Sequence, residues 1–245
     1  TEYERELNMQ EGTYTRTFKC KLQDETRIHV KSLRFLSLDQ INLGAIHYTV
    51  TAISGETKLD LIPYLDAGIT NQDSNWEDQF WEIDQVSTKE SKAFIHSHTL
   101  KTEFHVCTFM DTEFWAGKTQ IKRKEKPQRE INKTTLNYSH HLSEGDSITL
   151  IKYGGYITDR KHPKAELNKL ADTELQKASK LGFDRLLHNH KAKWAKIWER
   201  ADIRIGGDVK AQQAIRFNIF QLNQTYTGAD AGLNIGPKGF TGEKY

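Results

Sequence analysis

The sequence predicts a mainly β protein that continues into α-helices, with an antiparallel β-sandwich first and amphipathic helices after it. Three observations predict this order. Up to about residue 158, apolar and polar residues alternate with a period of two, and turn-forming residues interrupt the alternation at short intervals. From Pro163 onward the apolar spacing becomes three and four. A period of two is that of half-buried strands, and a spacing of three and four is that of amphipathic helices.

Strands are indicated by segments in which apolar residues share one parity and β-branched or aromatic residues are frequent. The clearest sets are Tyr14, Phe18, Cys20 and Leu22, then Ile46, Tyr48 and Val50, then Phe104, Val106, Thr108 and Met110. Turn signals separate such segments at residues 23–25, 54–55, 71–75 and 144–146. Many strands joined by short loops, without intervening helices, favour an antiparallel sandwich over a parallel sheet.

Three helices are predicted after the sandwich. Pro163 suits a first helical turn, and the stripe that follows it ends before Gly182, a favourable helix-terminating residue. A second helix is expected from about Phe183, and a third from about Val209 to Tyr226 with Asp208 as its N-cap. The apolar faces are, in order, Leu167, Leu170, Ala171, Leu175 and Ala178; Leu187, His190, Trp194, Ile197 and Trp198; and Ala211, Ile215, Ile219 and Leu222, widened by Phe220.

Composition excludes several classes of protein. The 245 residues carry a net charge of +2, with 36% hydrophobic and 28% charged residues, which is typical of a folded domain. No apolar run approaches the roughly 18–20 residues that span a bilayer, and residues 1–5 lack a signal-peptide core. The basic run at 122–129 contains Glu125 and Pro127, which favours a solvated hairpin loop over a nucleic-acid contact. We therefore expect neither a membrane nor a nucleic-acid partner.

Cys20 and Cys107 both lie in strand-like segments among apolar neighbours. Two buried, reduced thiols are the expected state, and this favours a cytoplasmic location.

From about residue 201 onward, one helix precedes a glycine-rich stretch, residues 228–245, that has no periodicity. A lone helix and a loop cannot form an independent core. This part is expected to open a larger helical domain whose remainder lies outside the chain.

Two segments, residues 211–222 and 233–245, resemble the start of the catalytic domain of glycoside hydrolase family 65. Three upstream segments, residues 7–12, 34–37 and 194–198, are similar in the same order to that family's N-terminal domain and linker. The resemblance implies a supersandwich, galactose mutarotase-like, followed by linker helices and the start of an (α/α)6 barrel. The implied division is 1–160 for the sandwich, lacking its first strands, 161–200 for the helical linker, and 201–245 for the truncated barrel.

The resemblance also implies an activity for the parent protein: phosphorolysis of an α-linked glucose disaccharide with inversion, giving β-glucose 1-phosphate and glucose. Maltose is the expected disaccharide, with inorganic phosphate as co-substrate and no cofactor. The family's catalytic acid is a barrel glutamate that no residue of this chain matches, so the chain itself is expected to be inactive. Family relatives are commonly homodimers, and the same is expected of the parent.

Two alternatives stay open. A phosphorylase for kojibiose, nigerose or trehalose, or a trehalose hydrolase, would share this architecture. From a different class, the chain could be a non-catalytic carbohydrate-binding module.

Lys238, Glu243 and Tyr245 are the candidate substrate-binding residues, because their segment matches one that leads into the family's sugar pocket. The alternative is that the glycines there permit a tight turn and these polar residues brace it. No catalytic residue is assigned.

Other suggestive groups are expected to be structural. His96, His98 and His105 have no acidic or cysteine partner at zinc-site spacing in the sequence, so they predict polar residues on a sheet face and no metal. An aromatic and acidic stretch could stack on sugars but is expected to pack at a sandwich edge; it comprises Trp76, Glu77, Asp78, Phe80, Trp81, Glu82 and Asp84.

Overall fold

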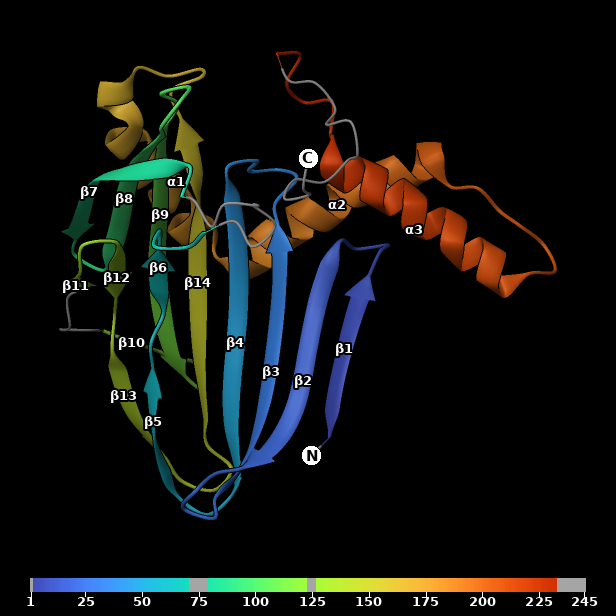
Figure 1. Cartoon of the computed structure of the whole chain (residues 1–245). Coiled ribbons are helices and arrows are strands. Elements are labelled where there is room, and N and C mark those ends of the chain that lie inside the picture. The colour runs from blue at the N-terminus through green and yellow to red at the C-terminus, as the bar shows by residue number, and fades with distance from the viewer. Residues whose placement is uncertain (1, 71–78, 123–126, 233–245) are drawn as a thin grey trace.

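The computed structural model describes residues 2–70, 79–122 and 127–232, and shows a β-rich part followed by helices (Figure 1). The strands are β1 (Tyr3–Asn8), β2 (Thr13–Lys21), β3 (Arg27–Leu36), β4 (Leu43–Ser54), β5 (Thr57–Leu61), β6 (Tyr64–Asp66), β7 (Trp81–Lys89), β8 (Lys92–Thr99), β9 (His105–Ala116), β10 (Thr119–Ile121), β11 (Gln128–Arg129), β12 (Lys133–Thr135), β13 (Tyr138–Leu142) and β14 (Ser147–Thr158). The helices are α1 (Leu167–Leu181), α2 (Phe183–Ala201) and α3 (Val209–Thr225), and a 3-10 turn at Lys164–Glu166 precedes α1.

One large antiparallel sheet organises the molecule. Within the described residues it has nine strands in the order β1-β2-β3-β4-β14-β9-β8-β7, with β10 paired to β9. Neighbours along the chain pair as hairpins except at the centre, where β14 enters between β4 and β9. Both strands that pair with β14, β4 and β9, are therefore distant from it in sequence.

A second β layer covers part of one face of the large sheet. It consists of two small antiparallel sheets, β13-β5 and β11-β12-β6. The core between the layers contains Ile28, Val30, Val50, Ala52, Leu61, Phe114, Leu136, Tyr138, Leu142 and Ile148. The predicted two-layer antiparallel architecture is confirmed.

Helices cover the opposite face of the same sheet. The stripe of α1 is buried as predicted, with Leu167, Ala171, Leu175 and Ala178 at or below 1% exposure. It packs with Phe183 and Leu186 of α2 on sheet residues Phe35, Leu43, Ala45, Phe94, Cys107, Phe109, Ile151, Tyr153 and Ile157. Central strands thus bury both faces, which explains why their sequences are apolar at consecutive positions.

The far half of α2 packs on the turn between β1 and β2. Trp194 lies so close to Gly12 that a Cβ atom built there would be 1.8 Å from the indole Nε1. Gly12 also has a φ of +65°, which a residue with a side chain rarely adopts. Next to it, the indole N–H of Trp198 donates to the carbonyl oxygen of Met9 at 3.0 Å. Only glycine fits this turn for both steric and conformational reasons.

Of the residues predicted to begin or end helices, Asp208 and Gly182 are confirmed and Pro163 is not. Asp208 caps α3, since its Oδ1 accepts the backbone N–H of Ala211 at 3.0 Å, and Gly182 separates α1 from α2 with a φ of +74°. Pro163 differs from the prediction: its ψ of 134° is extended, so it precedes the 3-10 turn instead of lying inside the first α-helical turn.

The cysteines form no disulfide: Cys107 is buried and Cys20 is half-buried. Burial raises the pKa of the Cys107 thiol to about 12, so this group is an inert core residue. Within the described residues, no helix is both long enough and apolar enough to cross a bilayer.

Candidate functional site

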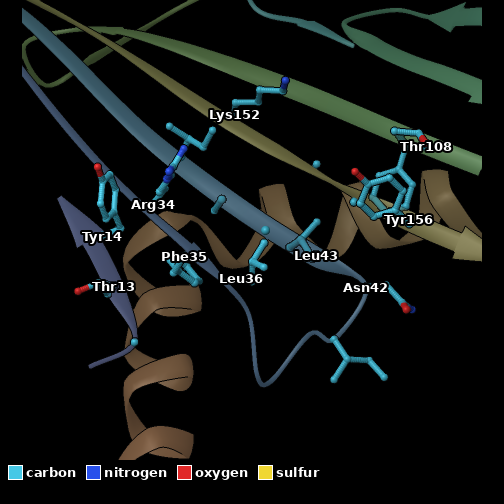
Figure 2. Close-up of a pocket in the computed structure, with 18 of the residues that line it drawn as sticks. Thr13, Tyr14, Arg34, Phe35, Leu36, Asn42, Leu43, Thr108, Lys152 and Tyr156 are labelled. Carbon is cyan, nitrogen blue, oxygen red and sulfur yellow. The ribbon is translucent and has the colours of Figure 1, made fainter. Parts of the chain in front are cut away.

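A groove of about 810 Å³ opens on the large sheet, and Figure 2 shows residues that line it. It lies on the face of the large sheet that also carries the small sheets. Successive side chains of a strand point to opposite faces of the sheet. Arg34 on β3, Lys152 on β14 and Thr108 on β9 lie an even number of residues from the residues of the same strands that form the core between the β layers, so they point to that same face and line the groove. Gln224 of α3 also contributes to the lining. The groove is therefore lined by residues of the sandwich and by one residue of α3.

Glycines form the floor of the groove. Gly44 of β4 and Gly154 of β14 are paired in register, so two adjacent positions on the sheet face carry no side chain. A Cβ atom built at Gly155 would lie 1.8 Å from the carbonyl oxygen of Asn42. The backbone of the loop before β4 can therefore approach β14 this closely only because residue 155 is a glycine. The sequence thus keeps this part of the sheet surface hollow.

Basic and aromatic groups line one side of the groove. The Arg34 guanidinium lies 4.6 Å from the centroid of the Tyr14 ring, within cation–π distance, and Figure 2 shows the two side by side. The Lys152 ammonium donates to the carbonyl oxygen of Tyr64 at 2.5 Å, and burial lowers the pKa of Lys152. Arg34 and Lys152 both pair with Ile46 from opposite sides, so two cations face the groove two strands apart, and they favour a partner that carries an acidic or hydrogen-bond-accepting group.

Exposed apolar side chains form the other part of the rim. Leu36, Ile41 and Tyr156 are 77%, 64% and 64% exposed although they line the groove. On α3, Phe217 and Leu222 are exposed as well; Leu222 belongs to the predicted apolar stripe, whereas Phe220 is buried. A cluster of exposed large apolar residues is typical of a surface that packs against another protein segment.

The predicted substrate-binding residues Lys238, Glu243 and Tyr245 lie outside the described residues, as do Trp76, Glu77 and Asp78. Of the aromatic stretch that is described, Phe80 is exposed. The indole N–H of Trp81 donates to the carbonyl oxygen of Ala67 at 3.0 Å, so Trp81 braces the loop after β6.

One expectation about the histidines is wrong. The sequence suggested no acidic partner near His98 and His105, yet Asp84 lies beside both, with its Oδ1 2.8 Å from Nδ1 of His98. Burial alone would raise the pKa of Asp84, but its hydrogen bond with His98 and the proximity of His105 together outweigh burial and lower it. The missed signal is the β7–β8 hairpin, because pairing Glu82 with His98 across its turn brings Asp84 close.

Three other histidines, His96, His188 and His190, do not join this cluster. His96 contacts Oδ1 of Asn168 in α1 at 2.8 Å instead of joining His98. His188 is exposed and His190 is buried, so the two side chains do not face a common ligand.

Comparison with known protein families gives two matches. Residues 1–197 match the model "Glycosyl hydrolase family 65, N-terminal domain", and residues 216–245 match "Glycosyl hydrolase family 65 central catalytic domain". The second match begins inside α3, the helix that borders the groove.

Individual relatives agree with these matches. The chain is 38% identical to maltose phosphorylase of Bacillus subtilis (strain 168), over 99% of this chain and 31% of that protein. It is 28% identical to α,α-trehalose phosphorylase of Thermoanaerobacter brockii, over 99% of this chain and 32% of that protein, and 23% identical to kojibiose phosphorylase of the same organism, over 100% and 32%. The chain thus spans about a third of the length of these curated relatives.

A solved structure from the human microbiome, whose name assigns it to the kojibiose phosphorylases, superimposes on 98% of this chain and 30% of its own, with a TM-score of 0.86 and 25% identity. The predicted sandwich fold is confirmed by this likeness.

Proposed function

This chain belongs to glycosyl hydrolase family 65, and we propose on that basis that its parent protein is an inverting disaccharide phosphorylase that uses maltose. The preference for maltose rests on identity. The chain is 38% identical to a maltose phosphorylase, 28% identical to a trehalose phosphorylase and 23% identical to a kojibiose phosphorylase, each over nearly its full length.

The proposed reaction needs one carboxylic acid and one bound phosphate. The acid protonates the departing glycosidic oxygen while phosphate attacks the anomeric carbon from the opposite face, so inversion gives β-glucose 1-phosphate and glucose. Because phosphate replaces the base-activated water of an inverting hydrolase, a second catalytic carboxylate is unnecessary. We assign this acid to the catalytic domain beyond the described residues, and no cofactor takes part.

Within the parent, we propose that this chain supplies the sandwich (1–160), a helical linker (161–200) and the opening of the catalytic barrel (201–245). The groove is then the surface on which the rest of the barrel packs. The observation that carries this assignment is the exposed apolar rim at Leu36 and Ile41, next to α3, where the catalytic-domain match begins. Lys238, Glu243 and Tyr245 remain our proposed substrate contacts in that domain.

We propose a cytoplasmic location for the parent protein. Two free cysteines fit a reducing cytoplasm. Disaccharide and phosphate are the proposed small-molecule partners, and a homodimer is the proposed assembly, which rests on the family resemblance alone.

The activity is tested by incubating the parent protein with maltose and inorganic phosphate. We expect phosphate-dependent release of glucose together with β-glucose 1-phosphate, identified by the anomeric proton in NMR. Kojibiose, nigerose and trehalose serve as parallel substrates, and the 245-residue chain is expected to show no turnover.

Each result bears on a different part of the proposal. Preference for kojibiose or trehalose would overturn maltose as the substrate, and hydrolysis without phosphate would overturn phosphorolysis. Turnover by the 245-residue chain would contradict our assignment of the catalytic acid.

The groove assignment predicts that Leu36→Asp harms the parent but not the isolated chain. Leu36 is largely exposed here, and exposed substitutions change stability by roughly 0.5 kcal/mol or less. Burying an unpaired carboxylate against the barrel should cost the parent several times more, about 2–4 kcal/mol.

Thermal unfolding of both proteins measures this difference, with Leu100→Asp as a matched control because Leu100 is also exposed but lies outside the groove. Equal effects of Leu36→Asp in the parent and in the isolated chain would refute the packing role.

A further inference from the structure

Asp84, His98 and His105 form a cluster of metal-ligating side chains outside the groove. Nδ1 of His98 is 2.8 Å from Oδ1 of Asp84, and Nδ1 of His105 is 3.4 Å from Oδ2 of the same carboxylate. One ligand atom from each of the three residues lies within 4.8 Å of the others. Ligand atoms of a tetrahedral zinc ion are separated by about 3.3–3.5 Å, given metal–ligand distances near 2.0–2.1 Å. The cluster is therefore close to the size that one ion requires.

Three adjacent strands hold the cluster. His98 at the end of β8 and His105 at the start of β9 are paired in register, so their side chains lie on the same face. Asp84 lies on β7 where the pairing with β8 shifts register, between Ile83 and Gln85, and this irregularity directs its carboxylate to His98. Ligands carried by paired strands are held more rigidly than ligands on loops.

Hydrogen bonding within the cluster is incomplete. Nδ1 of His105 is buried and, although it lies 3.4 Å from Oδ2 of Asp84, it has no hydrogen-bond partner within residues 2–70, 79–122 and 127–232. Nearby, the backbone N–H of Asp159 donates to the carbonyl oxygen of His105 at 3.0 Å. Oδ1 of Asp159 is also buried and has no partner among the described residues. Buried polar atoms without partners are uncommon and call for an explanation such as an ion.

We propose that Asp84, His98 and His105 bind a divalent transition-metal ion, with Zn²⁺ as the probe. Two imidazole nitrogens and one carboxylate oxygen are a ligand set that zinc accepts, with solvent as the fourth ligand. Nδ1 of His98 and Nδ1 of His105 are the nitrogen ligands. Oε2 of Glu82, 4.0 Å from Nε2 of His98, then faces the ring nitrogen that remains protonated and orients the imidazole.

A competing arrangement would keep the three residues as a hydrogen-bonded network without an ion. In that arrangement Asp84 and His98 share a proton, and the positive charge of Lys164 near Asp84 disfavours a cation. The two arrangements differ in zinc affinity and in proton release, because ligands must lose their protons when the metal binds.

The experiment is isothermal titration of the untagged 245-residue chain with Zn²⁺ at pH 7 after dialysis against a chelator. We expect one ion per chain, and at least about a tenfold weaker affinity in each of Asp84→Asn, His98→Ala and His105→Ala, as for loss of a metal-supporting group. His96→Ala is the matched control, since His96 is on the same strand but contacts Asn168. Circular dichroism verifies that each variant is folded.

A second readout uses Co²⁺ in place of Zn²⁺. The wild-type chain should give visible absorption of a four-coordinate cobalt ion, and His98→Ala and His105→Ala should lose it while His96→Ala keeps it. Absence of zinc binding up to millimolar concentration would overturn the site. Unchanged affinity in all three ligand variants would do the same, because the ion would then bind elsewhere.

Discussion

Trp194→Ala is expected to lower the free energy of unfolding by about 3–5 kcal/mol, the range for truncating a buried large aromatic residue. Trp194 is 1% exposed and stacks on Phe220 of α3, with ring centroids 4.8 Å apart and planes 22° from parallel. It also fills the space above Gly12 at the β1–β2 turn. Its removal therefore leaves a cavity where α2, α3 and the hairpin meet.

Urea denaturation followed by circular dichroism measures this loss. Trp194→Phe is the control, because the indole N–H has no hydrogen-bond partner among the described residues and its loss leaves no polar group unpaired. The phenylalanine variant should therefore retain most of the stability. A loss below about 1 kcal/mol in the alanine variant would mean that this contact does not hold α2 and α3 to the sandwich.

His190→Leu is expected to cost about 2–6 kcal/mol, because it leaves two backbone groups without a partner at roughly 1–3 kcal/mol each. Nδ1 of His190 accepts the backbone N–H of Leu38 at 3.2 Å, so this nitrogen carries no proton. Nε2 then carries the proton and donates it to the carbonyl oxygen of Gly12 at 3.0 Å. The neutral ring thus joins α2 to two loops of the large sheet.

The same contact predicts a dependence on pH. Burial lowers the pKa of His190, so below the ordinary histidine pKa of about 6.5 the unfolded chain binds more protons than the folded one. Stability is then lost as the pH falls from about 6.5 toward the lower folded pKa. Burial also lowers the pKa of His47, so His47 adds a similar loss of stability at low pH. The part of the pH dependence that is due to His190 is therefore the difference between the wild-type chain and His190→Leu.

Denaturation of the wild-type chain, His190→Leu and His188→Leu at pH 7.5 and pH 5 tests both statements. His188 is exposed on the same helix and should change neither the stability nor its pH dependence. If His190→Leu lost as much stability on acidification as the wild-type chain, the neutral bridging ring would be disproved.

Local patterns made much of the fold predictable. The alternation of β2 and β4, the buried stripe of α1 and the N-cap at Asp208 are each set by side-chain geometry within a few residues, and the structure has them where the sequence predicted. The position of Pro163 was less predictable, because a proline fits both just before a helix and inside its first turn.

The candidate site was less accessible from sequence. The groove depends on Gly44 and Gly154 being paired, and these residues are brought together by the insertion of β14 between β4 and β9. The apolar rim residues Leu36 and Ile41 carry no periodic signal, because they lie at and beyond the end of a strand. No single segment of sequence contains the information that these residues share one surface.

By itself, then, the sequence determined the change from strands to helices and the family membership, because periodicity and motif order are properties of the linear chain. Tertiary structure alone decided that Asp84 meets His98 and His105, that His190 bridges Leu38 and Gly12, and that the sheet has a hollow face. The physical reason is register: each of these contacts depends on how distant strands and helices align, and a shift of one residue would turn the same side chains to the opposite face.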